Sequence, residues 1–457
     1  MRTKQKHDAG SCPVYVDHPH ADELREIDRI LTDTPELAEL VYLDLVRGDI
    51  DPDKGRDGMS ADQVLRAAIA YHLSAPSFED LAFRLQDSSS YRRFCRIPEP
   101  EEAPSSSTLH DNITTISPIT WQAIGDMLIA RASKENIEDG TKIRSDCTVC
   151  ESNIHPPTDV SLCYDVVRVG TRLSDEVDDD IEITGSDHTL RASRRLLEFR
   201  NASGAERTDA CRKLLRVTGW TLGYVASAIE AIEQAATSTV KPNDENRDRL
   251  IAKLTRLLER GRAIVDQTRR RLIEGEKVPA SEKLVSLFEP HTDIIVTSQG
   301  EVEFGHKLAL TTGASSMILD VIVLEGNPAD SNLCELLVER HVQTFGDPPR
   351  QVAFDGGFAS GPNLDTLKND VGVEEVAFHK KRGLTEDEMT SSRRIYRQLR
   401  KFRAGIEGVI SWLKHTLGLD RCRWTSGLSG FRAYVHGAVV TANLLTMARH
   451  GLDRGAG

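Results

Sequence analysis

Apolar residues near the start of the chain recur at helical spacing. Residues 60–97 divide into several short amphipathic helices, each opened by a Ser or Asp that can cap its first turn. A further Ser-rich cap opens a helix at 105–113. Short helices joined by tight turns are typical of helix-turn-helix domains. We therefore predict a helical DNA-binding domain here, with a small helical packing unit that binds no ligand as an equal alternative.

From residue 141 the pattern changes to alternating and β-branched residues, which predict a strand over 141–152. Residues 187–275 return to helical spacing, and Pro-Asn-Asp at 242–244 separates two long helices. Strand patterns resume after residue 290 and then alternate with helices, the last of which is a long helix near 386–417. This order is typical of a mixed α/β domain.

The predicted fold class is therefore α/β, with a mixed sheet flanked by helices, a helical insertion and an all-α N-terminal domain. The predicted parts are a helical or flexible segment (1–58), the helical DNA-binding domain (59–135), the first part of the α/β domain (136–186), the helical insertion (187–280) and the rest of the α/β domain (281–450).

Charge is distributed unevenly along the chain. The net charge of −13 argues mildly against a nucleic-acid partner, yet nine basic and two acidic residues lie between Arg393 and Arg423. The alternative for this basic segment is an ordinary solvated helix face that binds no nucleic acid. Because no apolar run is long enough for a signal sequence or a bilayer span, and eight scattered Cys do not suggest disulfides, we expect a cytoplasmic protein.

Three acidic residues have unusual contexts. Asp146 lies within the strand that begins the α/β domain, and Asp355 follows the buried strand QVAF, directly before Gly356 and Gly357. Glu407 lies on a helix among basic residues. Ligands bind α/β sheets at strand ends, so Asp355 is a candidate site residue, although each acid alone could be an ordinary surface carboxylate.

Convergent carboxylates suit hard divalent ions such as Mg²⁺, which prefer oxygen ligands. Two such ions can stabilise the attacking and leaving oxygens of a phosphodiester. Zinc at Cys147 and Cys150 is disfavoured, because residues three apart on a strand point to opposite faces and further paired ligands are missing.

Several ordered stretches resemble the DDE transposases of bacterial and archaeal insertion sequences, specifically an IS-five/ISNCY-like group. The stretches are SDCTVCESNIHPPTD, EFGHKLAL, VLEGNPAD, AFDGGFAS and FRAGIEGVISWLKHTLGLDRCRW, with SADQVLRAAIAYHLSAPSFEDLAFRLQDSSSYRRFC upstream. The resemblance covers most of the chain from about residue 60 to 447. It implies an RNase H-like catalytic domain that performs cut-and-paste chemistry on DNA.

The resemblance implies that Asp146, Asp355 and Glu407 are the catalytic residues and the ligands of Mg²⁺, for which Mn²⁺ can substitute. It also implies that the protein binds DNA, both the terminal inverted repeats of the element and the target. A homodimer in the DNA complex and an association of the protein with the nucleoid are implied as well. The predicted DNA-binding residues are Arg403, Lys414, Arg400, Lys307, Arg92, Arg93 and Arg96.

The glutamate helix departs from the family signature at one position. Relatives carry Tyr, then Arg, Glu and Lys, and Arg403, Glu407 and Lys414 fit that spacing, but Arg400 stands in place of the tyrosine. Spacings of four and seven place the three matching side chains on one helix face, which is physical support independent of the family.

Other residues have open alternatives. His155 could lie beside the metal site or stabilise a turn, and His306 and Lys307 lie on a strand expected to neighbour Asp146. Trp412 and Trp424 could stack on a base, although core packing is the more common role of tryptophan. Two other functions remain possible: a DNA-binding repressor that no longer cuts, and an RNase H-like recombination nuclease.

Overall fold

The computed structural model describes residues 2–4, 14–48, 54, 58–74, 77–99, 101–177, 181–183, 185–238, 245–297, 300–424 and 427–455. The chain forms two compact units, each described by itself. We call Met1–Asn153 with Ile295–Gly457 the sheet unit, and Ile154–Ile294 the helical unit. No helix among the described residues is both long and apolar enough to cross a membrane.

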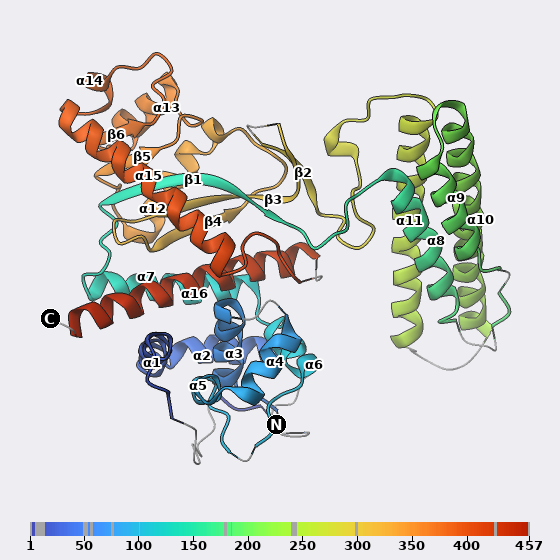
Figure 1. Cartoon of the computed structure of the whole chain (residues 1–457), viewed down its shortest axis with the longest axis horizontal. Helices are drawn as coiled ribbons and strands as arrows, with labels where there is room; N and C mark the ends of the chain where they lie inside the picture. The colour runs from blue at the N-terminus through green and yellow to red at the C-terminus, as the bar shows by residue number, and fades with distance from the viewer. Residues whose placement is uncertain are drawn as a thin grey trace. The chain divides into compact units, whose positions relative to one another are not determined.

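The described residues contain one mixed sheet of six strands with the order β2-β3-β1-β5-β6, in which β4 also pairs with β3 (Figure 1). The strands are β1 (Lys142–Glu151), β2 (Asp293–Val296), β3 (Val302–Thr312), β4 (Ile318–Val323), β5 (Gln351–Phe354) and β6 (Glu375–Phe378). Strand β3 is antiparallel to β1 and β4, whereas β1, β5 and β6 are mutually parallel. The mixed sheet predicted from the sequence is confirmed.

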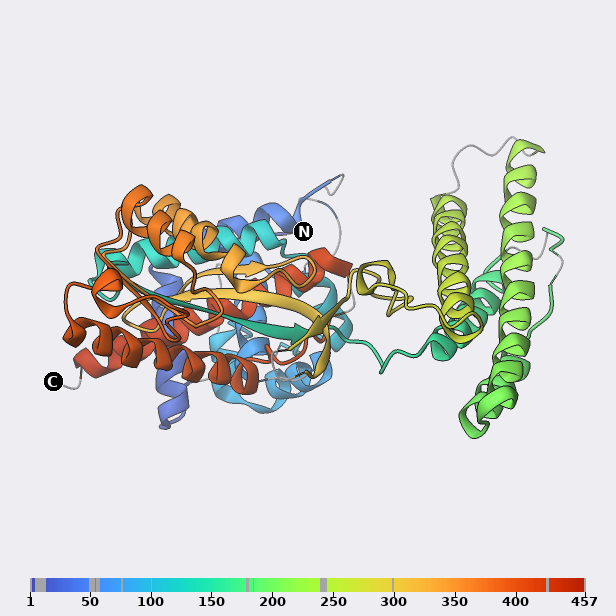
Figure 2. The ribbon, with the colours of Figure 1, turned by 90° about the horizontal axis from the view of Figure 1, so that it is seen from above.

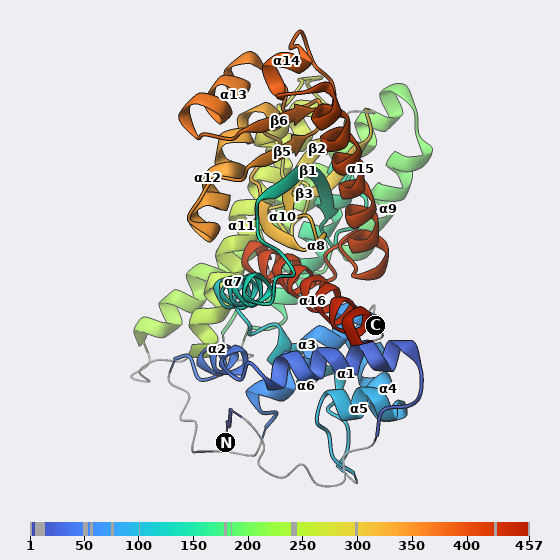
Figure 3. The same ribbon diagram turned by 90° about the vertical axis from the view of Figure 1, so that its left-hand side faces the viewer.

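Helices cover both faces of this sheet (Figure 3). One face carries α12 (Cys334–Phe345) and α13 (Gly361–Asp365), and the other carries α15 (Arg393–Thr416), which packs on β1, β5 and β6. The view from above shows the same two layers (Figure 2). Three short segments complete the connections: η2 (Asp330–Asn332), η3 (Thr366–Asp370) and α14 (Glu386–Met389).

The single long helix predicted near 386–417 is wrong at its start. Helix α14 ends at Met389. Thr390 after it has an extended backbone, and Ser392 then caps α15 by accepting from the Ile395 amide. Ser391 between them donates its amide to the Glu375 carboxylate at 2.8 Å. These side-chain bonds offer the backbone an alternative to a continuous helix.

The N-terminal helices form a layer around α16, which also reaches β4 (Figure 1). The bounds are α1 (Pro19–Thr32), α2 (Glu36–Leu45), α3 (Ala61–Ser74), α4 (Phe78–Asp87), α5 (Ser89–Phe94), α6 (Ser106–Ile113), α7 (Pro118–Lys134) and α16 (Gly427–Gly455). The short helices predicted over 60–113 are confirmed, with Ser77, Ser88 and Ser105 as their caps. One apolar core runs through these helices and the sheet.

The helical unit has an apolar core of its own. It contains α8 (Asp159–Ser174), α9 (Thr189–Asn201), α10 (Gly204–Ser238), α11 (Glu245–Leu272) and η1 (Ala280–Glu282). The Pro-Asn-Asp turn predicted at 242–244 lies outside the described residues. The domain limits drawn from the sequence remain predictions.

Arg144 on β1 ties the sheet to α15. Its guanidinium donates to the Phe402 carbonyl at 2.6 Å, to the Thr312 hydroxyl at 3.0 Å and to the Ser316 hydroxyl at 2.9 Å. It also lies 4.5 Å from the centroid of the Phe402 ring. A Cβ at Gly405 would lie 2.1 Å from the same guanidinium, so a larger residue there would displace it from these hydrogen bonds.

We predict that Arg144→Met lowers the free energy of unfolding by about 2 to 4 kcal/mol, because buried carbonyl and hydroxyl groups lose a charged donor. Chemical denaturation followed by far-ultraviolet circular dichroism measures the change in this free energy. Arg394→Met, at an exposed position on α15, is the matched control and should stay within about 0.5 kcal/mol of the parent protein. Equal stability of the two variants would contradict the anchoring role.

Candidate active site

Strand pairing places Asp146 and Asp355 beside each other. Strands β1 and β5 run parallel with Ser145 opposite Phe354, and each aspartate follows directly after its member of that pair. Because neighbouring strands lie about 4.8 Å apart, the two carboxylates come from adjacent positions of the sheet. Residues 209 apart in sequence are thereby brought together.

Helix α15 brings the third acid. Its buried side chains form one stripe: Tyr396, Leu399, Arg403, Ile406, Val409 and Leu413. The stripe follows helical periodicity and faces the sheet, and Arg403 occupies a position in it that an apolar residue would normally take. Glu407, one turn further along, lies at the rim with a side chain that is 63% exposed.

The guanidinium of Arg403 contacts all three acids. Its Nη2 lies 2.8 Å from Asp146 Oδ2 and 3.1 Å from Asp355 Oδ1, and its Nη1 lies 2.7 Å from Glu407 Oε1. Asp146 and Asp355 therefore share a single nitrogen atom. The structure brings together the three acids chosen from the sequence, around one cation.

Asp146 is the most enclosed of the three carboxylates. Burial raises the pKa of its carboxyl above the ordinary value, although the positive charge of Arg403 and the hydrogen bond from the Cys147 amide both oppose that shift. The amide lies 2.8 Å from Asp146 Oδ1, so each carboxylate oxygen has one donor. These donors fix the orientation of the carboxylate.

A cavity of about 520 Å³ opens beside Asp146 and Asp355. Four basic residues line it: Lys307, Lys380, Arg382 and Lys414. Two further acids, Glu303 and Asp330, line it as well. Of these six, the sequence had singled out only Lys307 and Lys414. Asp330 lies within VLEGNPAD, a stretch that resembled the family, and this was the one signal that could have identified it.

Lys307 lines the cavity from β3 but is largely buried. Its Nζ lies 2.6 Å from Asp330 Oδ1 and donates to the Pro328 carbonyl at 2.6 Å. Gly357 permits this arrangement, because a Cβ there would lie 2.4 Å from the Asp330 carboxylate. The ion pair therefore helps to form the wall of the cavity, while contact of Lys307 with DNA stays a prediction.

The donor atoms fit a hard divalent ion. Three carboxylates already surround a cation, the Arg403 guanidinium, and oxygen ligands are those that Mg²⁺ prefers. Across the described ranges, no three His, Cys, Asp or Glu side chains lie close enough together to hold an ion directly. A metal would therefore require these carboxylates to come closer together and to exchange Arg403 for the ion.

The remaining predicted DNA-binding residues are dispersed. Lys414 lines the cavity, whereas Arg400 is exposed on α15, with its guanidinium 5.9 Å from the Tyr396 ring. Arg92 is buried and donates to the carbonyls of Leu85, Pro98 and Glu101.

Arg93 is half-buried on α5. Arg96 follows the end of that helix with a positive φ of 52° and lies 3.2 Å from Asp62. DNA contacts by the arginines of this region stay predictions.

The other residues considered from the sequence lie in the following places in the structure. His155 lies 2.7 Å from Asp165 within the helical unit. Cys147 lines the cavity, whereas Cys150 is fully buried in the core. His306 is buried with its ring 4.8 Å from that of Phe431. Trp424 is buried among Tyr71, Phe78 and Tyr434, as expected of a core tryptophan.

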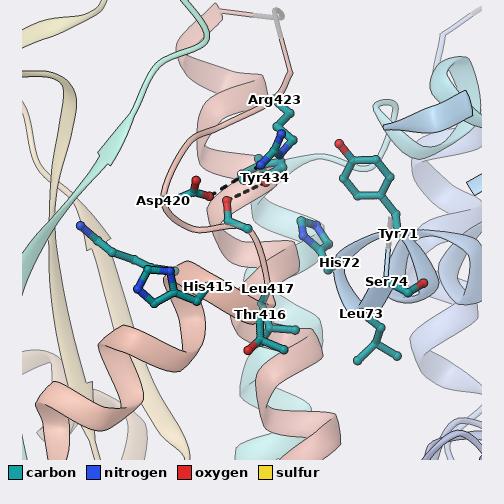
Figure 4. A pocket seen from close by; sticks show the side chains of 12 residues that line it. Tyr71, His72, Leu73, Ser74, His415, Thr416, Leu417, Asp420, Arg423 and Tyr434 are labelled. Atoms are coloured by element: carbon teal, nitrogen blue, oxygen red, sulfur yellow. Dashed lines mark hydrogen bonds and ion pairs between the residues drawn. The ribbon is translucent and has the colours of Figure 1, made fainter. Parts of the chain in front are cut away.

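A second cavity, of about 420 Å³, shares Lys414 with the first. Figure 4 shows the ends of α3 and α15 beside α16, with His72 pointing between them. The Tyr434 hydroxyl donates to the Gly418 carbonyl at 2.8 Å and closes one side. Burial lowers the pKa of His72 to about 3, and the nearby Leu417 backbone opposes this shift only in part.

Two family models match the chain. The model described as Transposase DDE domain matches residues 289–444, and the model described as Transposase domain (DUF772) matches residues 14–115. No curated protein and no solved structure gives a significant match. The first range contains Asp355 and Glu407, whereas Asp146 lies outside both matches.

We predict that His72 makes the protein sensitive to acid. Because its folded pKa is lowered from 6.5 to about 3, the unfolded chain binds the proton first, and stability is lost as the pH falls below 6.5. Between pH 7 and pH 4.5, the free energy of unfolding of His72→Phe should therefore fall by about 2 to 3 kcal/mol less than that of the parent. Denaturant unfolding at several pH values measures this, and parallel profiles for the two proteins would exclude it.

Proposed function

Because the chain belongs to the DDE-type insertion-sequence transposases, we propose that it cuts DNA at the ends of its element and joins the freed ends to target DNA. The observation that carries this proposal is the convergence of Asp146, Asp355 and Glu407 on one cation beside a cavity with basic walls. Carboxylates beside bound phosphate are what metal-assisted phosphodiester chemistry requires.

In this proposal Asp146, Asp355 and Glu407 hold Mg²⁺, for which Mn²⁺ can substitute. When bound, the ion lowers the pKa of the attacking water and neutralises charge on the phosphate. Water attacks the phosphorus at the element's end, the bond to the 3′ oxygen breaks, and that oxygen leaves as a 3′-hydroxyl. The same hydroxyl then attacks a phosphorus of the target and forms a new phosphodiester. The bond to the target's own 3′ oxygen breaks and that oxygen leaves as a 3′-hydroxyl, with no covalent enzyme intermediate.

The basic residues would hold the DNA backbone. Lys414 and Lys380 line the cavity beside the acids, and Arg400 lies exposed on the same helix as Glu407. Lysine and arginine bind phosphate by releasing its counterions, so the chain can bind DNA locally despite its net charge of −13. Arg93 is a candidate contact of the N-terminal helices with the terminal repeats.

A homodimer in the DNA complex is part of the same proposal, because two ends of an element must be joined to one target. The family matches do not specify an insertion-sequence group. The IS-five/ISNCY-like assignment therefore remains a hypothesis.

We predict that Asp355→Asn lowers metal-dependent cutting of DNA that carries the element's ends by about 10³-fold or more, because a ligand of the ion is lost. Binding to the same DNA should stay within about threefold of the parent. Gel assays with Mg²⁺ measure cutting, and electrophoretic mobility shifts measure binding. Asp370→Asn, at an exposed position in the same unit, is the matched control and should cut normally.

The outcomes separate the possible functions. If Asp355→Asn cuts DNA as well as the parent does, Asp355 is not a metal ligand and the proposed active site is excluded. Binding of the ends without metal-dependent cutting by the parent protein would favour a repressor. Cutting of branched DNA without any need for terminal sequences would favour a recombination nuclease.

A further inference from the structure

Arg403 occupies an unusual place for a residue that is expected to bind DNA. It is only 8% exposed, and its two terminal nitrogens contact the three carboxylates rather than the open part of the cavity. Its Nε atom makes no hydrogen bond to the described residues. All of the ion pairs of this guanidinium are therefore directed at the proposed metal ligands.

A guanidinium and a divalent ion compete for these oxygens. Mg²⁺ needs carboxylate oxygens at about 2.0 to 2.1 Å in an octahedral arrangement, and it would repel a positive charge held among the same ligands. The side-chain oxygens nearest to Arg403 are Asp146 Oδ2, Asp355 Oδ1 and Glu407 Oε1. Loading of the ion thus requires the guanidinium to leave at least some of them.

The cavity beside Asp146 and Asp355, two of the partners of Arg403, offers a reason for the guanidinium to leave them. Lys414, Lys380 and Arg382 line this space and would attract a DNA phosphate. A phosphate accepts paired hydrogen bonds from a guanidinium, as a carboxylate does. Once a phosphate lies in the cavity, Arg403 can exchange its carboxylate partners for phosphate oxygens without becoming an unpaired buried charge.

We propose that Arg403 couples metal loading to DNA binding: its guanidinium holds the three carboxylates together until a DNA phosphate takes their place. This inference rests on the proposed function. Without DNA, Arg403 competes with the ion and weakens its binding. With DNA, the carboxylates become free, so that metal and DNA each strengthen the binding of the other by the same factor.

The test measures Mn²⁺ binding to the whole chain by electron paramagnetic resonance of the free ion. Arg403→Gln removes the competing charge, so it should bind Mn²⁺ about tenfold more tightly than the parent when no DNA is present. Arg397→Gln, at an exposed position on the same helix, is the matched control and should bind as the parent does. Unchanged or weaker binding by Arg403→Gln would overturn the proposal.

The second arm adds a 30-base-pair duplex whose phosphates resist hydrolysis. In the parent and in Arg397→Gln, the duplex should strengthen Mn²⁺ binding about tenfold, and in Arg403→Gln this strengthening should fall to about twofold or less. A purely structural role of Arg403 would leave the coupling intact. Equal strengthening in all three proteins would therefore also overturn the proposal.

Two further variants keep the result decisive. If Arg403→Gln lowers the melting temperature so far that binding cannot be measured, Arg403→Lys keeps the charge but cannot bridge three carboxylates, and it should bind Mn²⁺ several-fold more tightly than the parent. Asp355→Asn separates the two hypotheses. If it binds Mn²⁺ as the parent does, the proposed function fails; if it loses Mn²⁺ while Arg403→Gln equals the parent, only the coupling fails.

Discussion

A buried guanidinium must have partners, and this constraint on Arg403 shapes the centre of the sheet unit. The residue lies in the stripe of α15 that faces the sheet, between Leu399 and Ile406. A charge in such a place is strongly destabilising unless it is paired. The partners come from β1, from the end of β5 and from α15 itself. The acid cluster thus also helps to hold α15 on the sheet.

The sequence predicted the members of this cluster better than their arrangement. Asp355 was identifiable because it ends a buried strand before two glycines, and Glu407 because it interrupts a basic helix. The RNase H-like α/β fold expected from the family resemblance is confirmed by the mixed sheet and by the matched DDE domain. That Ser145 faces Phe354 could not be predicted, because register between distant strands depends on tertiary packing.

Hydrogen bonds and ion pairs to acceptors elsewhere in the chain explain most of what could not be predicted from the sequence. The contact of Lys307 with DNA stays a prediction, but its ammonium group also binds Asp330 and the Pro328 carbonyl, which the sequence did not indicate. The DNA contact of Arg92 is likewise untested, but its guanidinium donates to three backbone carbonyls that the sequence did not indicate. Local patterns show that a residue is basic but not which acceptors lie within its reach. The break between α14 and α15 has the same origin, because the amide of Ser391 pairs with the carboxylate of Glu375.

The helical unit lies between β1 and β3 in the sequence, yet these two strands pair over most of their length. The entropic cost of closing a loop rises only slowly with its length, so a long insertion is tolerated. The insertion has an apolar core of its own, which further limits the freedom lost when its ends are joined. The first aspartate can therefore lie far from the other two acids in sequence. What the site needs is the pairing of β1 with β5, and an insertion with a separate core leaves that pairing undisturbed.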